Sequence, residues 1–399
     1  MRLVHLADLH LGFRQYYRLT PAGINQREAD VAATFRRVVE RVIALRPDVV
    51  VVGGDIFHNV RPTNPAILLA FQQFGELTRA LPDAEVVIVA GNHDLPRTSD
   101  AGCILKLFSG LGIHVVDKEP RRLTFPERDL AILAVPDAPG TRPKLDPDPA
   151  ARYNVLLLHG EVEGMLPDHV PPGDRASVEI TAEELGPARW TYVALGHYHV
   201  YREIAPNAFY SGSIDYTSFN AWGELLEERT AGLPGKGFVE RDLATGEHRF
   251  HHVEPARRLV DLPAVSARGR AVNDLDAAIR AVIDGCDGGI DEKIVRLVVR
   301  DGPRHGARDI DQTALREYRR RALHFHLDTR RPEILRMHGH GAPGRRPSLK
   351  DIVRDKLRGR VVDADVPREA LVALGLKYLD EVERGEASQQ GAAASAEEG

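Results

Sequence analysis

The first ninety residues alternate short runs of β-branched residues with longer segments of helical period, which restricts the chain to a layered α/β fold. One amphipathic helix is expected from Val31 to Ile43, where apolar residues recur on one face, and another over Ile67–Leu81 behind Pro65. Strands are predicted on either side of these helices, at Leu3–Ala7, Val49–Val52 and Val86–Ala90.

The pattern continues with three more apolar runs that predict strands. They lie at Leu130–Val135, Val155–Leu158 and Tyr192–Leu195. Polar and proline-rich stretches separate them, including an expected surface loop over Pro136–Pro149. Short strands and turns over Asn207–Asn220 and Gly237–Leu243 are expected to complete a first domain of residues 1–255.

The remaining sequence predicts a small second domain and a helical C-terminal part. Residues 256–331 read as strand, helix, strand, helix and strand, at Leu259–Val265, Asn273–Ile283, Lys293–Val299, Gln312–Arg320 and Ala322–Asp328. We expect residues 332–347, rich in Gly, Arg and Pro, to be a linker. Residues 348–384 carry two helical patterns, and residues 385–399 are expected to be disordered. One face of the second helix is apolar, with Leu371, Leu374, Tyr378 and Val382.

Composition excludes several protein classes. The sequence has no run of about 18 apolar residues and no leader-like start, so membrane spanning and secretion are not expected. Cys103 and Cys286 are far apart and outside any CxxC spacing, which argues against a disulfide scaffold and a thiolate zinc site and favours a cytoplasmic location. The net charge of −5 does not indicate a nucleic-acid binder, so a claim of DNA binding needs a local site.

Five short polar motifs, each just past an apolar run, supply the candidate chemistry. They are Asp8-Leu9-His10, Gly54-Asp55-Ile56-Phe57-His58, Gly91-Asn92-His93-Asp94, His159-Gly160 and Gly196-His197-Tyr198-His199. Parallel strands deliver their carboxyl ends to one edge of a sheet, so we expect these motifs to converge. A single Asp-x-His pair, or a Gly-Asn-His-Asp turn, arises readily without function. Five motifs in order at strand ends favour a common site.

The residue types in these motifs are typical of a two-metal site. Oxygen and imidazole donors without thiolate suit manganese, iron or zinc. Seven candidate ligands exceed the needs of one tetrahedral ion, whereas two ions about 3.5 to 4 Å apart, bridged by one carboxylate, would use them all. The candidates are Asp8, His10, Asp55, Asn92, His159, His197 and His199.

On these motifs the sequence resembles the calcineurin-like metallophosphoesterases, and among them the SbcD-type nuclease that works with the SMC-like ATPase SbcC in prokaryotic double-strand-break repair. Further stretches support that resemblance, at Tyr210–Ser213, Thr217–Asn220 and Lys236–Phe238. The resemblance implies a layered β-sandwich flanked by helices, a small α+β capping domain, and C-terminal helices that bind the ATPase. It covers residues 1 to about 255 most strongly.

The resemblance also implies roles for individual residues. One metal would be bound by Asp8, His10, Asp55 and His199, and the other by Asp55, Asn92, His159 and His197. Asp55 would bridge two Mn²⁺ ions, with Fe, Mg or Zn as other candidates. His93 would stabilise the transition state or protonate the leaving oxygen. His58 occupies the position where related phosphatases carry an Asp, which suits a nuclease better, although it can also merely cap the site.

By resemblance, the activity would be single-strand endonuclease and double-strand 3′–5′ exonuclease in DNA repair and recombination, by a homodimer formed through the nuclease domain. Arg14, Tyr17 and Arg61 follow the first two metal motifs and are candidate DNA contacts, with an ordinary polar loop as the other reading. Two alternative functions stay open. One is a stand-alone phosphodiesterase or phosphatase acting on a small molecule, and the other is an inactive scaffolding subunit, which would be expected to lack a ligand.

Overall fold

The structure is a computed structural model that describes residues 1–96, 102–140, 144–164, 175–301, 310–330, 349–358, 367 and 369–379. The chain forms two compact units, Met1–Pro332 and Glu333–Gly399, and each is described by itself.

The first sheet of the larger unit has six strands in the order β14-β13-β1-β2-β3-β4. Its four parallel strands are β1 (Arg2–Leu6), β2 (Val49–Val52), β3 (Glu85–Val89) and β4 (His114–Val116). Two antiparallel strands, β13 (Gly237–Asp242) and β14 (His248–His252), extend it beside β1. Residues distant in sequence thus complete the sheet that the N-terminal residues begin.

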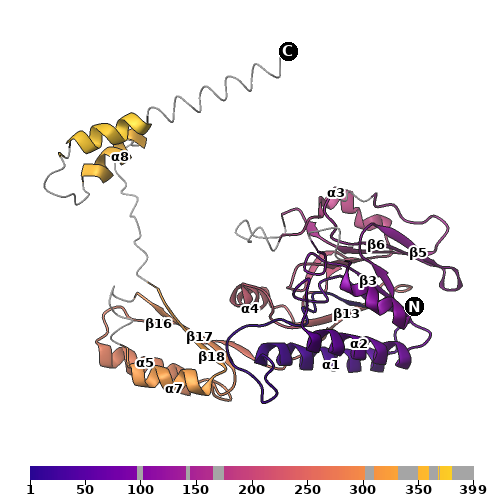
Figure 1. The fold of residues 1–399 in the computed structure, drawn as a ribbon, viewed down its shortest axis with the longest axis horizontal. Helices are drawn as coiled ribbons and strands as arrows, with labels where there is room; N and C mark the ends of the chain where they lie inside the picture. Colours follow the sequence, from indigo (N-terminus) through magenta and orange to yellow (C-terminus); the bar gives the residue numbers. More distant parts are fainter. Residues whose placement is uncertain are drawn as a thin grey trace, which may run out of the picture. The chain divides into compact units, whose positions relative to one another are not determined.

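Two long helices, α1 (Gln26–Leu45) and α2 (Asn64–Ala80), lie side by side against this sheet (Figure 1). The side chain of Asn25 caps α1, and that of Thr63 caps α2, where Pro65 occupies the first turn. The apolar face of α1, including Phe35, is fully buried against the sheet. A 3₁₀ segment, η1 (Ile104–Leu111), packs beside α2.

The second sheet has the order β11-β12-β10-β7-β6-β5. Its strands are β5 (Arg121–Phe125), β6 (Leu130–Val135), β7 (Tyr153–His159), β10 (Tyr192–Gly196), β11 (Arg202–Ala205) and β12 (Ala208–Tyr210). One core cluster combines Val49 and Val51 of the first sheet with Ile132, Val155 and Leu157 of the second. The two sheets therefore pack face to face, and the predicted layered α/β sandwich is confirmed.

Shorter elements complete this part of the unit. The strands β8 (Glu161–Val162) and β9 (Glu179–Ile180) pair with each other, and helix α3 (Ala182–Leu185) and the 3₁₀ segments η2 (Pro126–Arg128) and η4 (Pro187–Arg189) lie in connections. Helix α4 (Ala221–Thr230) begins at its N-cap Asn220. No helix was predicted here, because the apolar residues of α4, which are Ala221, Trp222, Leu225 and Leu226, do not form a clear stripe at helical spacing.

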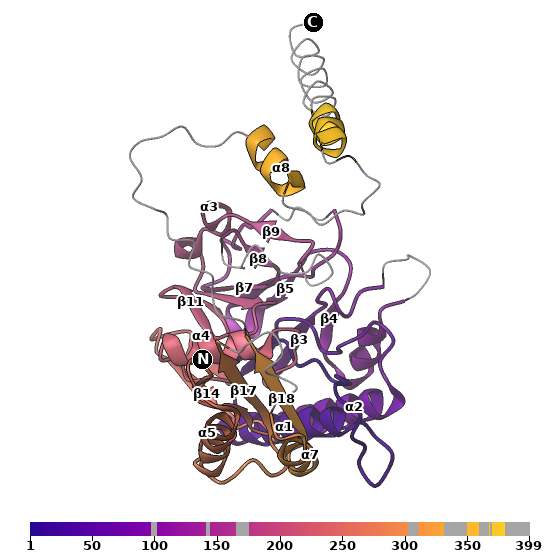
Figure 2. The same cartoon turned by 90° about the vertical axis from the view of Figure 1, so that its left-hand side faces the viewer.

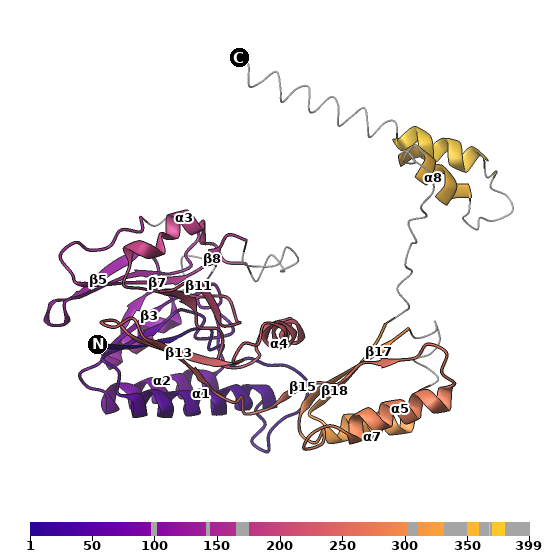
Figure 3. The same ribbon diagram turned by 180° about the vertical axis from the view of Figure 1, so that it is seen from behind.

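The four strands β15 (Leu259–Asp261), β16 (Val265–Ser266), β17 (Ile294–Arg300) and β18 (His324–Thr329) form a separate parallel sheet, in which β17 and β18 run side by side (Figure 2). Helices α5 (Val272–Asp284) and α7 (Gln312–Arg321) cover one face of it (Figure 3). The expectation of one strand over Leu259–Val265 is wrong. Pro263 lacks the N–H that a continuous ladder needs, so β15 and β16 pair with different parts of β17.

The smaller unit contains α8 (Leu349–Arg358) and a helical segment over residues 369–379. A Cβ atom on Gly375 would lie 2.4 Å from Leu357 Cδ1, so the two helices pack closely at this glycine. Leu374 and Tyr378 of the predicted apolar stripe are 48% and 60% exposed. Val382, the expected linker 332–347 and the expected tail 385–399 lie outside the described residues. None of the helices described is both long and apolar enough to cross a membrane.

Candidate metal centre

All five polar motifs lie at the carboxyl ends of strands in the two packed sheets. Asp8 and His10 follow β1, Asp55 follows β2, and Asn92 follows β3. The second sheet contributes its part from β7, whose last residue is His159, and from the segment after β10, which carries His197 and His199. All seven predicted ligands therefore come from five strand ends that the fold brings to one edge of the sandwich.

The backbone at these strand ends is unusual. Four predicted ligands have left-handed backbone conformations, with φ of 54° at Asp8, 45° at His10, 51° at Asp55 and 105° at His197. Such conformations cost energy in residues other than glycine and concentrate at functional sites. They turn the chain sharply at the end of each strand, so that the side chain faces the neighbouring strand ends.

Close approach between the sheets also requires small residues. A Cβ atom on Gly196 would lie 1.8 Å from the carbonyl oxygen of Gly53, so the two sheets touch backbone to backbone at this edge. That contact brings β2 of the first sheet and β10 of the second near enough for their terminal side chains to share one site.

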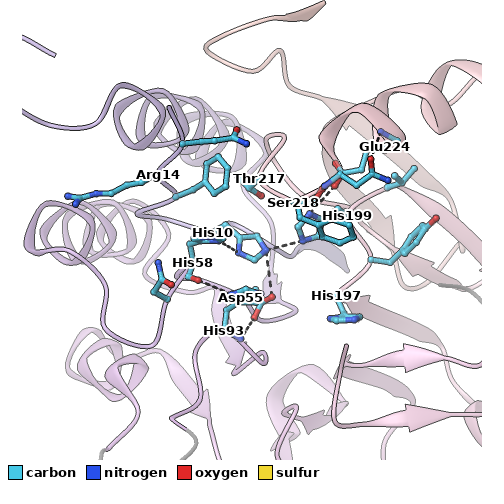
Figure 4. Close-up of a pocket in the computed structure, with 18 of the residues that line it drawn as sticks. His10, Arg14, Asp55, His58, His93, His197, His199, Thr217, Ser218 and Glu224 are labelled. Atoms are coloured by element: carbon cyan, nitrogen blue, oxygen red, sulfur yellow. Dashed lines mark hydrogen bonds and ion pairs between the residues drawn. The ribbon is translucent and has the colours of Figure 1, made fainter. Parts of the chain in front are cut away.

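One half of the site gathers around His10. Its Nε2 lies 2.9 Å from His199 Nε2 and 3.6 Å from Asp55 Oδ2 (Figure 4). Donor atoms of Asp8, His10 and His199 all lie within 4.8 Å of one another. Two imidazole nitrogens that face each other across so short a gap, beside carboxylates, form a cluster of the size that a single cation occupies.

The other half gathers around Asn92. Its Oδ1 lies 3.1 Å from His159 Nε2 and 3.3 Å from His197 Nδ1. Asp55 Oδ2 lies 3.7 Å from His159 Nε2, and Asp8, Asp55 and His159 form a second compact donor group. Asp55 thus borders both halves of the cluster, which is the position of a ligand shared by two metals.

Hydrogen bonds with backbone groups fix the orientation of two candidate ligands. His159 Nδ1 donates to the carbonyl oxygen of Gly53 at 2.6 Å, which leaves Nε2 as the free donor atom facing Asp55. The backbone N–H of His197 donates to both carboxylate oxygens of Asp8 at 3.1 Å. The donor set of carboxylate, amide and imidazole, oriented in this way, fits two divalent cations such as manganese, iron, zinc or magnesium.

Burial and charge set the protonation of the cluster. Burial would raise the pKa of Asp55, but His159 and His93 more than offset it and hold the pKa below its usual value. Burial, then the charge of His199, lowers the pKa of His10 well below the usual range. Asp55 raises the pKa of His159, and Glu224 raises that of His199, in both cases against the effect of burial. Because a histidine must be neutral to bind a metal, cation binding at these two rings would displace protons.

His93 and His58 lie beside the ligands on the first sheet's side. The backbone N–H of His93 donates to Asp55 Oδ1 at 2.9 Å, and its ring Nδ1 donates to the carbonyl oxygen of His58 at 2.8 Å. The Nε2 atom of His93 therefore remains available to a substrate. Burial and the neighbouring His93 lower the pKa of His58 to about 4, so this ring is neutral near pH 7.

Asp94 ties two of the motif loops together. Its carboxylate accepts backbone hydrogen bonds from Ile56, Phe57 and Gly91, at 3.0 to 3.1 Å. The side chain is fully buried. Asp94 thus holds the Asp55 loop and the Asn92 loop in register, a role beyond the local turn that its sequence context suggested.

Sequence reasoning missed a buried charged group behind His199. Glu224 Oε1 lies 3.2 Å from His199 Nδ1, and Glu224 Oε2 lies 2.5 Å from Lys236 Nζ. Lys236 is only 1% exposed, pairs also with Glu228 at 3.2 Å, and donates to the backbone carbonyl of His199 at 2.9 Å. Lys236 lies in a stretch that carried the resemblance, but no spacing pattern links it to Glu224 or to His199.

A cavity of about 500 Å³ opens over the cluster. Of the three candidate DNA contacts, Arg14 lines it, and Arg14 Nε donates to Glu28 at 2.7 Å. Tyr17 and Arg61 are exposed and are not among the residues that line it. Tyr16, between Arg14 and Tyr17, instead stacks on His324 of the small sheet domain, with ring centroids 4.0 Å apart.

Comparison with known proteins gives a family match over half of the chain. The family described as calcineurin-like phosphoesterase matches residues 1–201. Similar curated proteins are named DNA double-strand break repair protein Mre11. The one from Methanopyrus kandleri is 31% identical over 288 residues, covering 65% of this chain and 58% of that protein.

A second Mre11 protein, from Methanocaldococcus jannaschii, is 27% identical over 265 residues, covering 64% of this chain and 66% of that protein. A third, from Aeropyrum pernix, is 39% identical over 101 residues, or 25% of this chain and 22% of that protein. The chain therefore spans less than two thirds of the length of the relatives it matches.

Proposed function

Because this chain belongs to the calcineurin-like phosphoesterase family, as its motif series predicted, we propose that it is a metal-dependent DNA nuclease that hydrolyses phosphodiester bonds at DNA ends. The observation that carries the proposal is the convergence of seven carboxylate, amide and imidazole ligands at one edge of the sandwich. The name of the similar proteins, double-strand break repair protein Mre11, supports DNA as the substrate and repair as the process.

In this proposal Asp8, His10, Asp55 and His199 hold one cation. Asp55, Asn92, His159 and His197 hold the other. A bound pair of divalent cations lowers the pKa of a water molecule and neutralises the charge that builds on the phosphate oxygens during hydrolysis. Manganese is the proposed metal, with iron, magnesium and zinc as the other candidates for this donor set.

The chain's own residues supply the remaining chemistry. His93 is the proposed catalytic residue, because its Nδ1 is bound to the His58 carbonyl and its Nε2 is left to face the phosphate. With Nδ1–H donated to the His58 carbonyl, Nε2 carries a proton in the imidazolium form of the ring, and that proton would pass to the departing oxygen or stabilise the transition state through a hydrogen bond. The neutral ring of His58 packs parallel to that of His93, at 5.3 Å between centroids, and would keep His93 in position.

The proposal also specifies the activities and the assembly of the protein. The proposed activities are single-strand endonuclease and double-strand 3′–5′ exonuclease. The proposed assembly is a homodimer formed through the nuclease domain, with an SbcC-type ATPase bound by residues 348–384. Arg14 is the candidate DNA contact best supported by its position beside the cavity, and Tyr17 and Arg61 stay predictions. A cytoplasmic location agrees with Cys103 and Cys286 both being free thiols.

One experiment separates this proposal from action on a small molecule. Purified protein is incubated with end-labelled single-stranded and duplex DNA, with and without manganese, and in parallel with bis-p-nitrophenyl phosphate. We expect manganese-dependent cleavage of both DNA and the small ester. Cleavage of the small ester with no cleavage of either DNA would favour a stand-alone phosphodiesterase, and no cleavage of any substrate would favour an inactive scaffold.

A further inference from the structure

Two groups of residues line the cavity over the metal centre. One is the ligand cluster, including His10, Asp55 and His199, and the other includes the segment from Thr217 to Asn220 that precedes α4. Figure 4 shows Thr217 and Ser218 between Arg14 and Glu224, above the cluster. A substrate whose phosphate lies on the ligands would therefore have this segment beside it.

An exposed aromatic ring lies in that segment. Phe219 lines the cavity and is 56% exposed, whereas Phe13, Tyr198 and Val200, which also line it, are 2% to 8% exposed. A phenyl ring held in solvent beside a reaction centre costs hydrophobic free energy that contact with a ligand would recover. Among the apolar residues described around this cavity, Phe219 is thus the one with a largely exposed apolar surface that a ligand can contact.

The segment that carries Phe219 is anchored on both sides. Before it, Asp215 is fully buried and accepts hydrogen bonds from Arg27 and Thr34, both at 2.9 Å. After it, Asn220 donates its backbone N–H to Ser218 Oγ at 3.1 Å and caps α4 through Gly223. The ring is therefore presented by a preorganised turn, so a ligand need not order it on binding.

The charges around the cavity, outside the ligand cluster, are already paired within the protein. Arg14 binds Glu28, and Glu224 binds Lys236 and His199. Glu227 pairs with Arg202 and accepts a hydrogen bond from Tyr198 at 2.8 Å. This wall of the cavity therefore suits a flat, uncharged group attached to the phosphate that the cluster binds.

We propose that the cavity binds a nucleobase next to the scissile phosphate, and that the ring of Phe219 is the surface on which this base stacks. The inference rests on the proposed function, because it takes DNA as the substrate, and it adds a base-binding subsite to the metal centre. The volume of about 500 Å³ lies within the range of small-ligand pockets, about 300 to 1,000 Å³. Stacking accepts every base, so the subsite favours unpaired nucleotides without reading sequence.

The test compares two small esters that differ by a nucleoside. Thymidine 5′-monophosphate p-nitrophenyl ester carries a base, and methyl p-nitrophenyl phosphate does not. Phe219→Ala should lower kcat/KM for the thymidine ester by about 5- to 150-fold, the range for loss of one base stack. The methyl ester should change by no more than about twofold, and the content of bound manganese should be unchanged.

Three further variants and substrates sharpen the comparison. Phe219→Trp should retain the activity on the thymidine ester, because the flat surface remains, and Phe219→Leu should lose it. Leu226→Ala is the matched control, since Leu226 is an exposed residue of α4, 59% exposed, and is not among the residues that line the cavity. A single-stranded oligonucleotide with an abasic site beside the cleaved bond should be cut equally by the wild type and by Phe219→Ala.

Two results would overturn the subsite. Equal losses on both esters would make Phe219 a support of the metal centre, and equal activity of Phe219→Ala and wild type on the thymidine ester would place the base elsewhere. Failure of the proposed function looks different, because the wild type itself would then cleave DNA in neither form. That result would remove the subsite as well.

Discussion

At the scale of single residues, His93 separates catalysis from metal binding. Its contact with Asp55 is made by the backbone N–H, which remains in a His93→Ala variant. We therefore expect this variant to keep its bound manganese and its affinity for DNA, while turnover falls by roughly 100-fold or more, the scale for loss of a general acid or electrostatic group. His58→Ala should show a milder loss. Loss of manganese from His93→Ala, measured by equilibrium dialysis, would recast His93 as a ligand.

Glu224 and Glu228 offer a matched pair for testing how His199 is oriented. Both carboxylates lie on α4 and pair with the buried Lys236, but the one within ion-pair distance of His199 is Glu224. We expect Glu224→Gln to weaken binding of one manganese equivalent by about 10- to 100-fold, the usual effect of losing a partner that orients a metal-binding histidine.

The control for that experiment is Glu228→Gln, which removes one charge from the same lysine and should leave both manganese equivalents bound. Calorimetric titration of each variant with manganese reports affinity without needing catalysis. Equal weakening in the two variants would show that α4 supports the fold in general, with no specific hold on His199.

The sequence predicts the ligands of this site better than their surroundings. Asp8, His10 and Asp55 lie in short motifs whose spacing and position after strands predict metal binding. Glu224 and Lys236 lie in segments that contact His199 only in the folded chain. The partners of an ion pair have no fixed separation in sequence, so no pattern predicts this contact. Phe219 is likewise an ordinary loop residue until the cavity beside it is known.

At the scale of elements, the strands predicted from apolar runs, such as β2 and β6, agree with the structure within two residues, whereas the short strands β4 and β5 were not predicted. Helix α4 was missed because its burial depends on two Glu residues that pair with Lys236, just before β13, and such a pattern is the opposite of an apolar stripe. β15 and β16 were merged because Pro263 alone marks their break.

Strand β1 also contributes a pH-dependent element to stability. His5 is fully buried beside Tyr192, with Nδ1 3.0 Å from the tyrosine hydroxyl, and burial lowers the pKa of His5 to about 3. The unfolded chain takes up this proton below about pH 6.5, whereas the folded chain does so only near pH 3. The contribution of neutral His5 to the free energy of unfolding is therefore fully present above pH 6.5 and is lost as the pH falls towards 3.

We expect the wild type to lose about 1.4 kcal/mol of unfolding free energy through His5 between pH 7.5 and 5.5. His5→Gln does not titrate, so its own loss over this range should be smaller by that amount. Urea denaturation of both proteins at the two pH values measures the difference. An identical pH dependence in both would mean that His5 is protonated without penalty in the folded protein.

At the scale of the whole molecule, the site exists because two sheets meet at one edge. Each sheet carries an incomplete ligand set, and the backbone contact of Gly53 with Gly196 brings the sets together. The motif order in the sequence predicted that the ligands converge, but it did not indicate that two sheets share them. That arrangement follows from packing across the core cluster that both sheets build.

The C-terminal unit supports a prediction about assembly. Leu374 and Tyr378 are exposed on a helical segment that packs on α8, which leaves apolar surface for a partner. A protein truncated after Gly344 should fold and keep manganese-dependent cleavage of single-stranded DNA. It should fail to co-purify with an SbcC-type ATPase and lose ATP-stimulated cleavage of duplex ends.

Full-length protein with Leu374→Ala and Tyr378→Ala is the control for the truncation, since it keeps the chain and removes the exposed side chains. It should show the same weakened binding in a pull-down at equal concentrations. Undiminished binding of the ATPase by the truncated protein would place the docking surface within residues 1–344.

The proposed two-metal centre depends on Asp55 as the ligand shared by both metals, and manganese titration combined with DNA cleavage on the same samples tests this most directly. The wild type should bind two equivalents per chain and cleave end-labelled DNA, and Asp8→Ala should weaken mainly one equivalent. Asp55→Ala should lose both equivalents and the cleavage together. Two bound equivalents and near-normal cleavage in Asp55→Ala would contradict the two-metal centre.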